Sequence, residues 1–213
     1  MDVMSNLPFL LVGLLGFFEI RRQLAAGQFQ EKSEKWPYLL FFIGVFLTGL
    51  GSAYYHWMPG NPRLVWDRLP MTMVIMSLVS IILMEKAGTK IGIRALGPLL
   101  AVGFASVAYW IWTEAIGQGD LRFYGFVLFY PVALIPLILY LFPKPVHGIN
   151  ELVKLGLFYA LAKFFEAKDE WVYSVTGVIS GHTLKHLLAA MSVYWIMVML
   201  QHRGKIRFQG GLK

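Results

Sequence analysis

Apolar residues fill seven long blocks of the chain, and short polar segments separate these blocks. The blocks cover roughly residues 3–20, 36–56, 66–84, 95–112, 123–142, 152–165 and 178–200. A helix that crosses a bilayer needs about 20 mostly apolar residues, with a range of about 17–25. The sixth block is the weakest candidate because Lys154 and Lys163 bracket it. We predict seven membrane-spanning helices, with six as the alternative count.

The blocks lack the period-two alternation that a membrane β-barrel requires. Backbone groups in lipid must find their hydrogen-bond partners within the spanning segment, which leaves helices as the spanning elements. We therefore predict an all-α fold: a polytopic seven-transmembrane helix bundle over residues 1–200, followed by a basic cytoplasmic tail over residues 201–213. We expect two prolines in the fifth block, Pro131 and Pro136, to kink that helix.

Composition agrees with a membrane protein. Of the 213 residues, 57% are hydrophobic and 15% are charged, whereas a soluble domain has about 45–50% apolar and about 25% charged residues. The chain has no cysteine, which excludes disulfides and thiolate metal sites.

The net charge of +7 is distributed unevenly between the two predicted sides of the membrane. Basic residues in cytoplasmic segments fix the orientation of a membrane protein. This bias predicts an N-terminus outside and a cytoplasmic C-terminus, in the inner membrane if the source is bacterial, and it speaks against a nucleic-acid partner. One side holds Arg21, Arg22, Lys32, Lys35, Lys86, Lys90, Arg94, Lys144, Arg203, Lys205, Arg207 and Lys213, and the other holds Arg63, Arg68, Arg122 and Lys168.

Polar residues cluster where predicted helices begin or end on the outer side. Ser52 and His56 lie four residues apart at the end of the second helix, and Asp67 begins the third. His182 and His186 lie four apart near the start of the seventh helix, so each pair shares a helix face. All five side chains are expected in the same leaflet, where ionisable groups are costly and indicate function.

Three imidazoles suit zinc, which in catalytic sites commonly has three protein ligands and one open position. Asp67 is then placed to exchange a proton with water, and Ser52 to donate to an oxyanion or to hold the water. Simpler readings stay open: core histidines bonded to carbonyls, an interfacial Asp67–Arg68 ion pair, or a Ser52 bonded to its own helix. Three positions stay open for the Lys185 side chain: it snorkels to the membrane surface, pairs with an acid such as Glu166, or faces the cavity.

We expect structural roles for the glycines of the second helix and for the tryptophans. Gly44, Gly49 and Gly51 in the second helix are expected to permit close helix packing. The tryptophans near the helix ends are expected to anchor the protein at the membrane interfaces; these are Trp36, Trp57, Trp66, Trp110, Trp112 and Trp171.

The motifs "GSAYYHW" (51–57), "WDRLPM" (66–71) and "SGHTLKHLLAA" (180–190), with "SNL" at 5–7, resemble the alkaline ceramidase family. That family belongs to a group of seven-helix membrane hydrolases that includes the adiponectin-type receptors. The resemblance implies that His56, His182 and His186 bind zinc, with Ser52 and Asp67 around the catalytic water. It also implies hydrolysis of ceramide-like N-acyl lipids to a long-chain base and a fatty acid.

The sequence departs from the family pattern in two places. Arg68 stands where the family has a glutamate, and only Asp2 remains of the acidic calcium-binding stretch that eukaryotic members carry before the first helix. The residues do not decide between amide and ester, or the oligomeric state. Two other functions stay open: a non-enzymatic lipid sensor with a structural zinc site, and a carrier of protons or ions.

Overall fold

The computed structural model describes residues 1–142 and 148–210, with the backbone alone for residues 204–210. Every regular element in these ranges is helical, so the predicted all-α fold class is confirmed. The helices are α1 (Leu7–Ala25), α2 (Lys35–Trp57), α3 (Asn61–Lys86), α4 (Thr89–Ala115), α5 (Arg122–Leu141), α6 (Ile149–Ala167), α7 (Asp169–Thr176) and α8 (Gly181–Gly210). Short 3-10 turns, η1 (Met4–Asn6) and η2 (Lys32–Glu34), precede α1 and α2.

Six of the described helical segments are long and apolar enough to cross a membrane. They are Met4–Ala25, Lys32–Trp57, Asn61–Lys86, Thr89–Ala115, Arg122–Leu141 and Gly181–Arg203. They give the chain the character of a multi-pass membrane protein. The sixth predicted span lies within α6, which is not among the six and carries Glu151, Lys154, Lys163 and Glu166.

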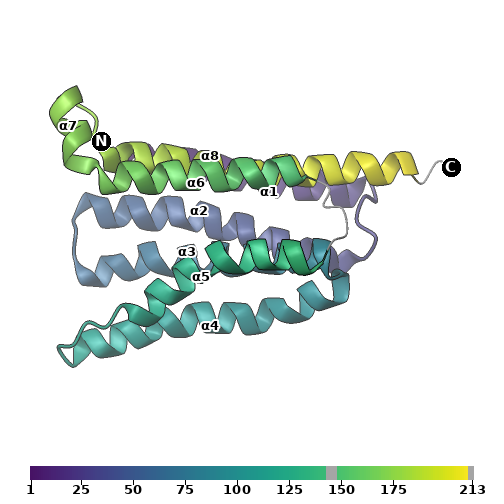
Figure 1. Cartoon of the computed structure of the whole chain (residues 1–213), viewed down its shortest axis with the longest axis horizontal. Coiled ribbons are helices and arrows are strands. Elements are labelled where there is room, and N and C mark those ends of the chain that lie inside the picture. The colour runs from purple at the N-terminus through teal and green to yellow at the C-terminus, as the bar shows by residue number, and fades with distance from the viewer. Residues whose placement is uncertain (143–147, 211–213) are drawn as a thin grey trace.

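The long helices run back and forth along one axis, so that the N-terminus and the C-terminus lie at opposite ends of the bundle (Figure 1). α6 lies along α8, and α2 lies beside α3. α5 changes direction along its length, as its two internal prolines predict (Figure 1). Short α7 projects at the end where α8 begins.

Close helix contacts in the core depend on small residues, as predicted for the glycines of α2. A side chain at Gly44 would meet Val74 of α3, and one at Gly49 would meet Leu10 of α1. The main buried cluster is built mostly from α1, α2, α3 and α8, with single residues from α5 and α6, and Phe41, Phe42 and Ile81 are among its fully buried members.

Two features of the structure have no counterpart in the sequence pattern. The segment predicted as a basic tail from residue 201 continues α8 as far as Gly210, and Arg203 within it is buried. Helix α7 was not predicted, because its eight residues are too few to form an apolar block. Residues 143–147, which include His147, lie outside the described residues.

Candidate metal centre

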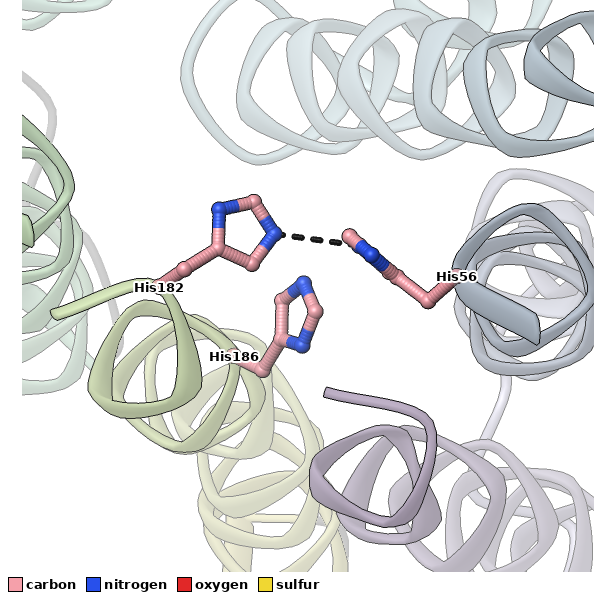
Figure 2. A group of neighbouring side chains, drawn as sticks. All are labelled: His56, His182 and His186. Carbon is pink, nitrogen blue, oxygen red and sulfur yellow. Dashed lines mark hydrogen bonds between the residues drawn. The ribbon is translucent and has the colours of Figure 1, made fainter. Parts of the chain in front are cut away.

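Three histidines converge at the end of the bundle that holds the N-terminus. α2 carries His56 in its last turn, and α8 carries His182 and His186 on one face of its first two turns. Figure 2 shows the three rings turned toward one shared space. One ring nitrogen from each histidine can be chosen so that all lie within 4.8 Å of one another. Helices more than a hundred residues apart in sequence therefore bring three imidazoles together, as the sequence predicts.

The nitrogen spacing suits a tetrahedral metal ion. The Nε2 atoms of His56 and His182 are 3.0 Å apart. Zinc binds imidazole nitrogen at about 2.0–2.1 Å, which in a tetrahedron separates two ligand nitrogens by about 3.3 Å. Small ring movements would bring the three nitrogens to these distances. The residues therefore fit a three-histidine metal site.

Ser5 of η1 fixes the orientation of His186. Its hydroxyl donates to the backbone carbonyl of Asp2 at 2.9 Å and lies 2.8 Å from Nδ1 of His186. A serine hydroxyl has one proton, so with that proton on the Asp2 carbonyl the Ser5 oxygen accepts from Nδ1–H. Nε2 of His186 then carries the lone pair. A hydrogen bond of this kind sets the tautomer of metal-binding histidines.

Asp2 ties the N-terminal segment to the start of α8. Its carboxylate accepts hydrogen bonds from Thr183 at 2.7 Å and from Ser180 at 3.4 Å. Partial burial raises the pKa of this carboxyl, but the Thr183 hydrogen bond and the nearby imidazoles outweigh burial, and the net shift is downward. The sequence pattern predicts no role for Ser5 or Asp2, because a single 3-10 turn has no periodic signal.

Ser52 and Asp67 form a second pair beside the histidines. Ser52 is buried on α2, one turn before His56, and its side chain is hydrogen-bonded to the Asp67 carboxylate on α3. Gly51 makes this contact possible. A Cβ at this glycine would lie 1.9 Å from the carbonyl oxygen of Trp66 and 3.1 Å from the amide nitrogen of Asp67.

This pairing decides between the alternatives left open for Ser52 and Asp67. Ser52 bonds across to α3 rather than back to its own helix. Asp67 forms no ion pair with Arg68 in the described structure, because the Arg68 guanidinium lies over the ring of Trp110 instead.

Lys185 bridges α8 and α6 at the edge of the histidine cluster. Its Nζ lies 3.0 Å from Oε1 of Glu166 and 3.4 Å from Nδ1 of His182. Lys163 donates to the other oxygen of Glu166 at 2.7 Å. Of the three possibilities for Lys185, the structure therefore selects pairing with Glu166. The ammonium group also interacts electrostatically with Asp67, so it links the histidines to the Ser52–Asp67 pair.

The junction of α6 and α7 positions the first turn of α8. Oδ1 of Asp169 accepts the backbone N–H of His182 at 2.6 Å. A Cβ at Gly181 would lie 2.2 Å from the carbonyl oxygen of Phe165, so this glycine permits the close approach. The backbone that carries two of the histidines is thus held directly by its neighbours.

His202 and Trp110 lie outside the cluster of three histidines. His202 lies at the other end of α8, 3.2 Å from a carboxylate oxygen of Glu151, and takes no part in the cluster. Trp110 is buried at 3% exposure, so its predicted role as an interfacial anchor is wrong, whereas Trp57, Trp66 and Trp112 are exposed.

No protein-family model matches the chain, and no curated protein matches it. The functional reading therefore depends on the motifs and on the geometry described above.

Proposed function

We propose that this protein is a zinc-dependent integral-membrane hydrolase that cleaves the amide bond of ceramide-like N-acyl lipids. One observation carries the proposal: three histidines from α2 and α8 converge beside a hydrogen-bonded Ser52–Asp67 pair. His56, His182 and His186 would hold the ion. When bound, zinc supplies a Lewis acid that polarises a carbonyl and lowers the pKa of its water to about 7.

Asp67 is the general base and acid in this proposal. A water oxygen attacks the amide carbonyl carbon, Asp67 accepts the water proton, and the C–N bond breaks as Asp67 returns the proton to the leaving nitrogen. The products are a free amine and a fatty acid. Ser52 donates to the Asp67 carboxylate and holds it in one orientation. The other role considered for Ser52, donation of a hydrogen bond to the oxyanion, is less consistent with its hydrogen bond to Asp67.

The test is hydrolysis of a panel of N-acyl lipids by the purified, zinc-loaded protein. Asp67→Asn is expected to lower turnover by about 10²- to 10⁴-fold, the usual contribution of a general acid–base group. Zinc content should stay unchanged, because Asp67 is not a proposed ligand. Asp120→Asn, at the same end of the bundle but paired with Arg122, is the matched control. Zinc binding without turnover of any lipid would contradict the proposal and favour the lipid-sensor alternative.

We also propose that α6 is the seventh span, with the N-terminus outside and the C-terminus in the cytoplasm. The four charged groups of α6 all have partners. Glu166 binds Lys163 and Lys185, Glu151 contacts His202, and Lys154 lies 4.1 Å from the Trp195 ring centroid. Paired charges on a helix that packs along α8 are compatible with a position inside a bundle. If the source is bacterial, the membrane would be the inner one.

The absence of cysteine makes this topology easy to test. Gln118→Cys, between α4 and α5, should react with a membrane-impermeant maleimide in intact cells. Ala26→Cys, between α1 and α2, should react only after the cells are opened. The reverse pattern would contradict the proposed orientation.

A further inference from the structure

Arg68 differs from the other basic residues at the histidine end of the bundle. Its Nη1 atom is fully buried and has no hydrogen-bond partner. The other guanidinium nitrogens make no hydrogen bond to any described residue. By contrast, Arg122 is paired with Asp120 at 2.7 Å, and Arg63 donates to the Met58 carbonyl at 2.8 Å. A guanidinium that is partly buried and unpaired is costly to maintain.

Aromatic rings hold the Arg68 side chain in place. Its guanidinium carbon lies 4.2 Å from the ring centroid of Trp110 on α4 and 5.2 Å from that of Tyr124 on α5. Both tyrosine and tryptophan are largely buried. Stacking on a ring face fixes the plane of a guanidinium but leaves its N–H donors, which point outward in that plane, without acceptors.

The acids around Arg68 are already engaged. Asp67 is hydrogen-bonded to Ser52, and Glu114 accepts a hydrogen bond from Asn61. Asp120 is bonded to Arg122 and Tyr109. Within the described part of the chain, no carboxylate lies within ion-pair distance of Arg68. The Arg68 side chain is half-buried, and its donors have no acceptor in the described part of the chain.

We infer that Arg68 binds an anionic oxygen group, a carboxylate or a phosphate, of the lipid ligand. Guanidinium donors match the paired oxygens of such groups, often through two parallel hydrogen bonds. Arg68 follows Asp67 directly, so the anion would lie close to the reacting amide. This inference rests on the proposed function and narrows it: the preferred substrate is an acidic N-acyl lipid. The fatty acid product also carries such a group, a carboxylate.

The experiment compares two substrates that share acyl chain and amide and differ in charge. N-palmitoylglycine carries a carboxylate, and N-palmitoylethanolamine is neutral. The wild type should have the higher kcat/KM with N-palmitoylglycine. Arg68→Met, which keeps an unbranched side chain but removes the guanidinium, should lower kcat/KM for this substrate about 10-fold or more, in line with lost hydrogen bonds to a charged group. The change for N-palmitoylethanolamine should stay below about 3-fold by the same reasoning.

Arg63→Met is the matched control, because Arg63 also lies over a tyrosine ring at this end of the bundle. It should change neither substrate's kcat/KM. Arg68→Lys, which keeps the charge but loses the fork, should retain part of the acid preference and provides a second variant if Arg68→Met fails to fold. Equal losses on both substrates would overturn the inference, because they indicate a purely structural role.

Two further arms separate the possible outcomes. Inhibition by palmitate that disappears in Arg68→Met, with no preference between the two amides, assigns the subsite to the fatty acid product. If neither amide is hydrolysed, the proposed function fails, and binding then tests the subsite alone. N-palmitoylglycine should still raise the melting temperature of the wild type more than N-palmitoylethanolamine does. The absence of that difference would overturn the inference as well.

Discussion

The two ends of the bundle both contain buried or half-buried ionisable groups, but these groups are arranged in opposite ways. At the end near the C-terminus, Arg203 is 1% exposed and lies 2.7 Å from both Glu34 and Glu85. At the other end, three imidazole rings face one another, with two Nε2 atoms 3.0 Å apart. The first arrangement pairs one cation with two carboxylates. The second gathers three ring nitrogens within 4.8 Å of one another, an arrangement that can hold a cation.

This difference separates a structural network from a candidate functional site. The Arg203 network ties together η2, the end of α3 and the late part of α8. Tyr38 and Thr89 add hydrogen bonds to the same two glutamates. We therefore expect changes at the Arg203 end to act on stability, and changes at the histidine end to act on metal binding and turnover.

The largest expected effect on stability comes from Arg203→Met. Removing one partner of a buried ionic network leaves the others uncompensated and costs about 3–5 kcal/mol. Denaturant unfolding in detergent should show this loss. The variant that remains folded should bind as much zinc as the wild type. If Arg203→Met lost zinc while it remained as stable as the wild type, the result would contradict the assignment of stability to one end and metal binding to the other.

Gly51→Ala should have the next largest effect. The added methyl group would collide with the backbone carbonyl of Trp66, forcing α2 and α3 apart beside Asp67. We expect a destabilisation of about 1–3 kcal/mol, with a loss of turnover. Gly97→Ala in α4 is the control, because a Cβ there meets nothing within 4 Å. If the two variants had the same stability and turnover, the result would contradict a close contact between α2 and α3 at Gly51.

Ser5→Ala should weaken zinc binding without changing the fold. Loss of a hydrogen bond that orients a metal-binding histidine typically reduces metal affinity about 10- to 100-fold. Competition with a zinc chelator measures this change. Ser174→Ala, on exposed α7 at the same end, should have no effect. An unchanged affinity in Ser5→Ala would mean that Ser5 does not act on His186.

Asp120→Asn should have the smallest effect. Hydrogen bonds from Arg122 hold the pKa of Asp120 well below its usual value, so this pair stabilises the fold above about pH 4 and its contribution is lost as the pH falls further. The pair is exposed, and exposed ion pairs contribute little. Unfolding curves should show a small destabilisation of the variant at pH 7 and a smaller one at pH 3. A larger loss at pH 3 than at pH 7 would contradict this sign.

Much of the fold and part of the site follow from the sequence. The spacing of His182 and His186 puts them on one face of α8, and the positions of His56 and Asp67 at helix ends put them at the same end of the bundle. The structure brings the three histidines together and pairs Ser52 with Asp67. Zinc binding and catalysis by these residues stay predictions.

Other features depend on contacts that a linear pattern does not carry. Ser5 and Asp2 lie before the first helix, and their roles require the N-terminal turn to pack against α8. In the sequence, Arg203 looks like any cytoplasmic basic residue, and only its partners Glu34 of η2 and Glu85 of α3 explain its burial. The partner of Lys185 likewise depends on the packing of α6 against α8.

The most direct test of the central claim is elemental analysis of protein purified without chelators, in parallel with His56→Ala and His202→Ala. Three histidine ligands predict about one zinc per chain in the wild type. His56→Ala should retain little of it, and His202→Ala, outside the cluster, should retain all of it. Wild-type protein without stoichiometric metal, or zinc that persists in His56→Ala, would contradict a metal centre shared by α2 and α8.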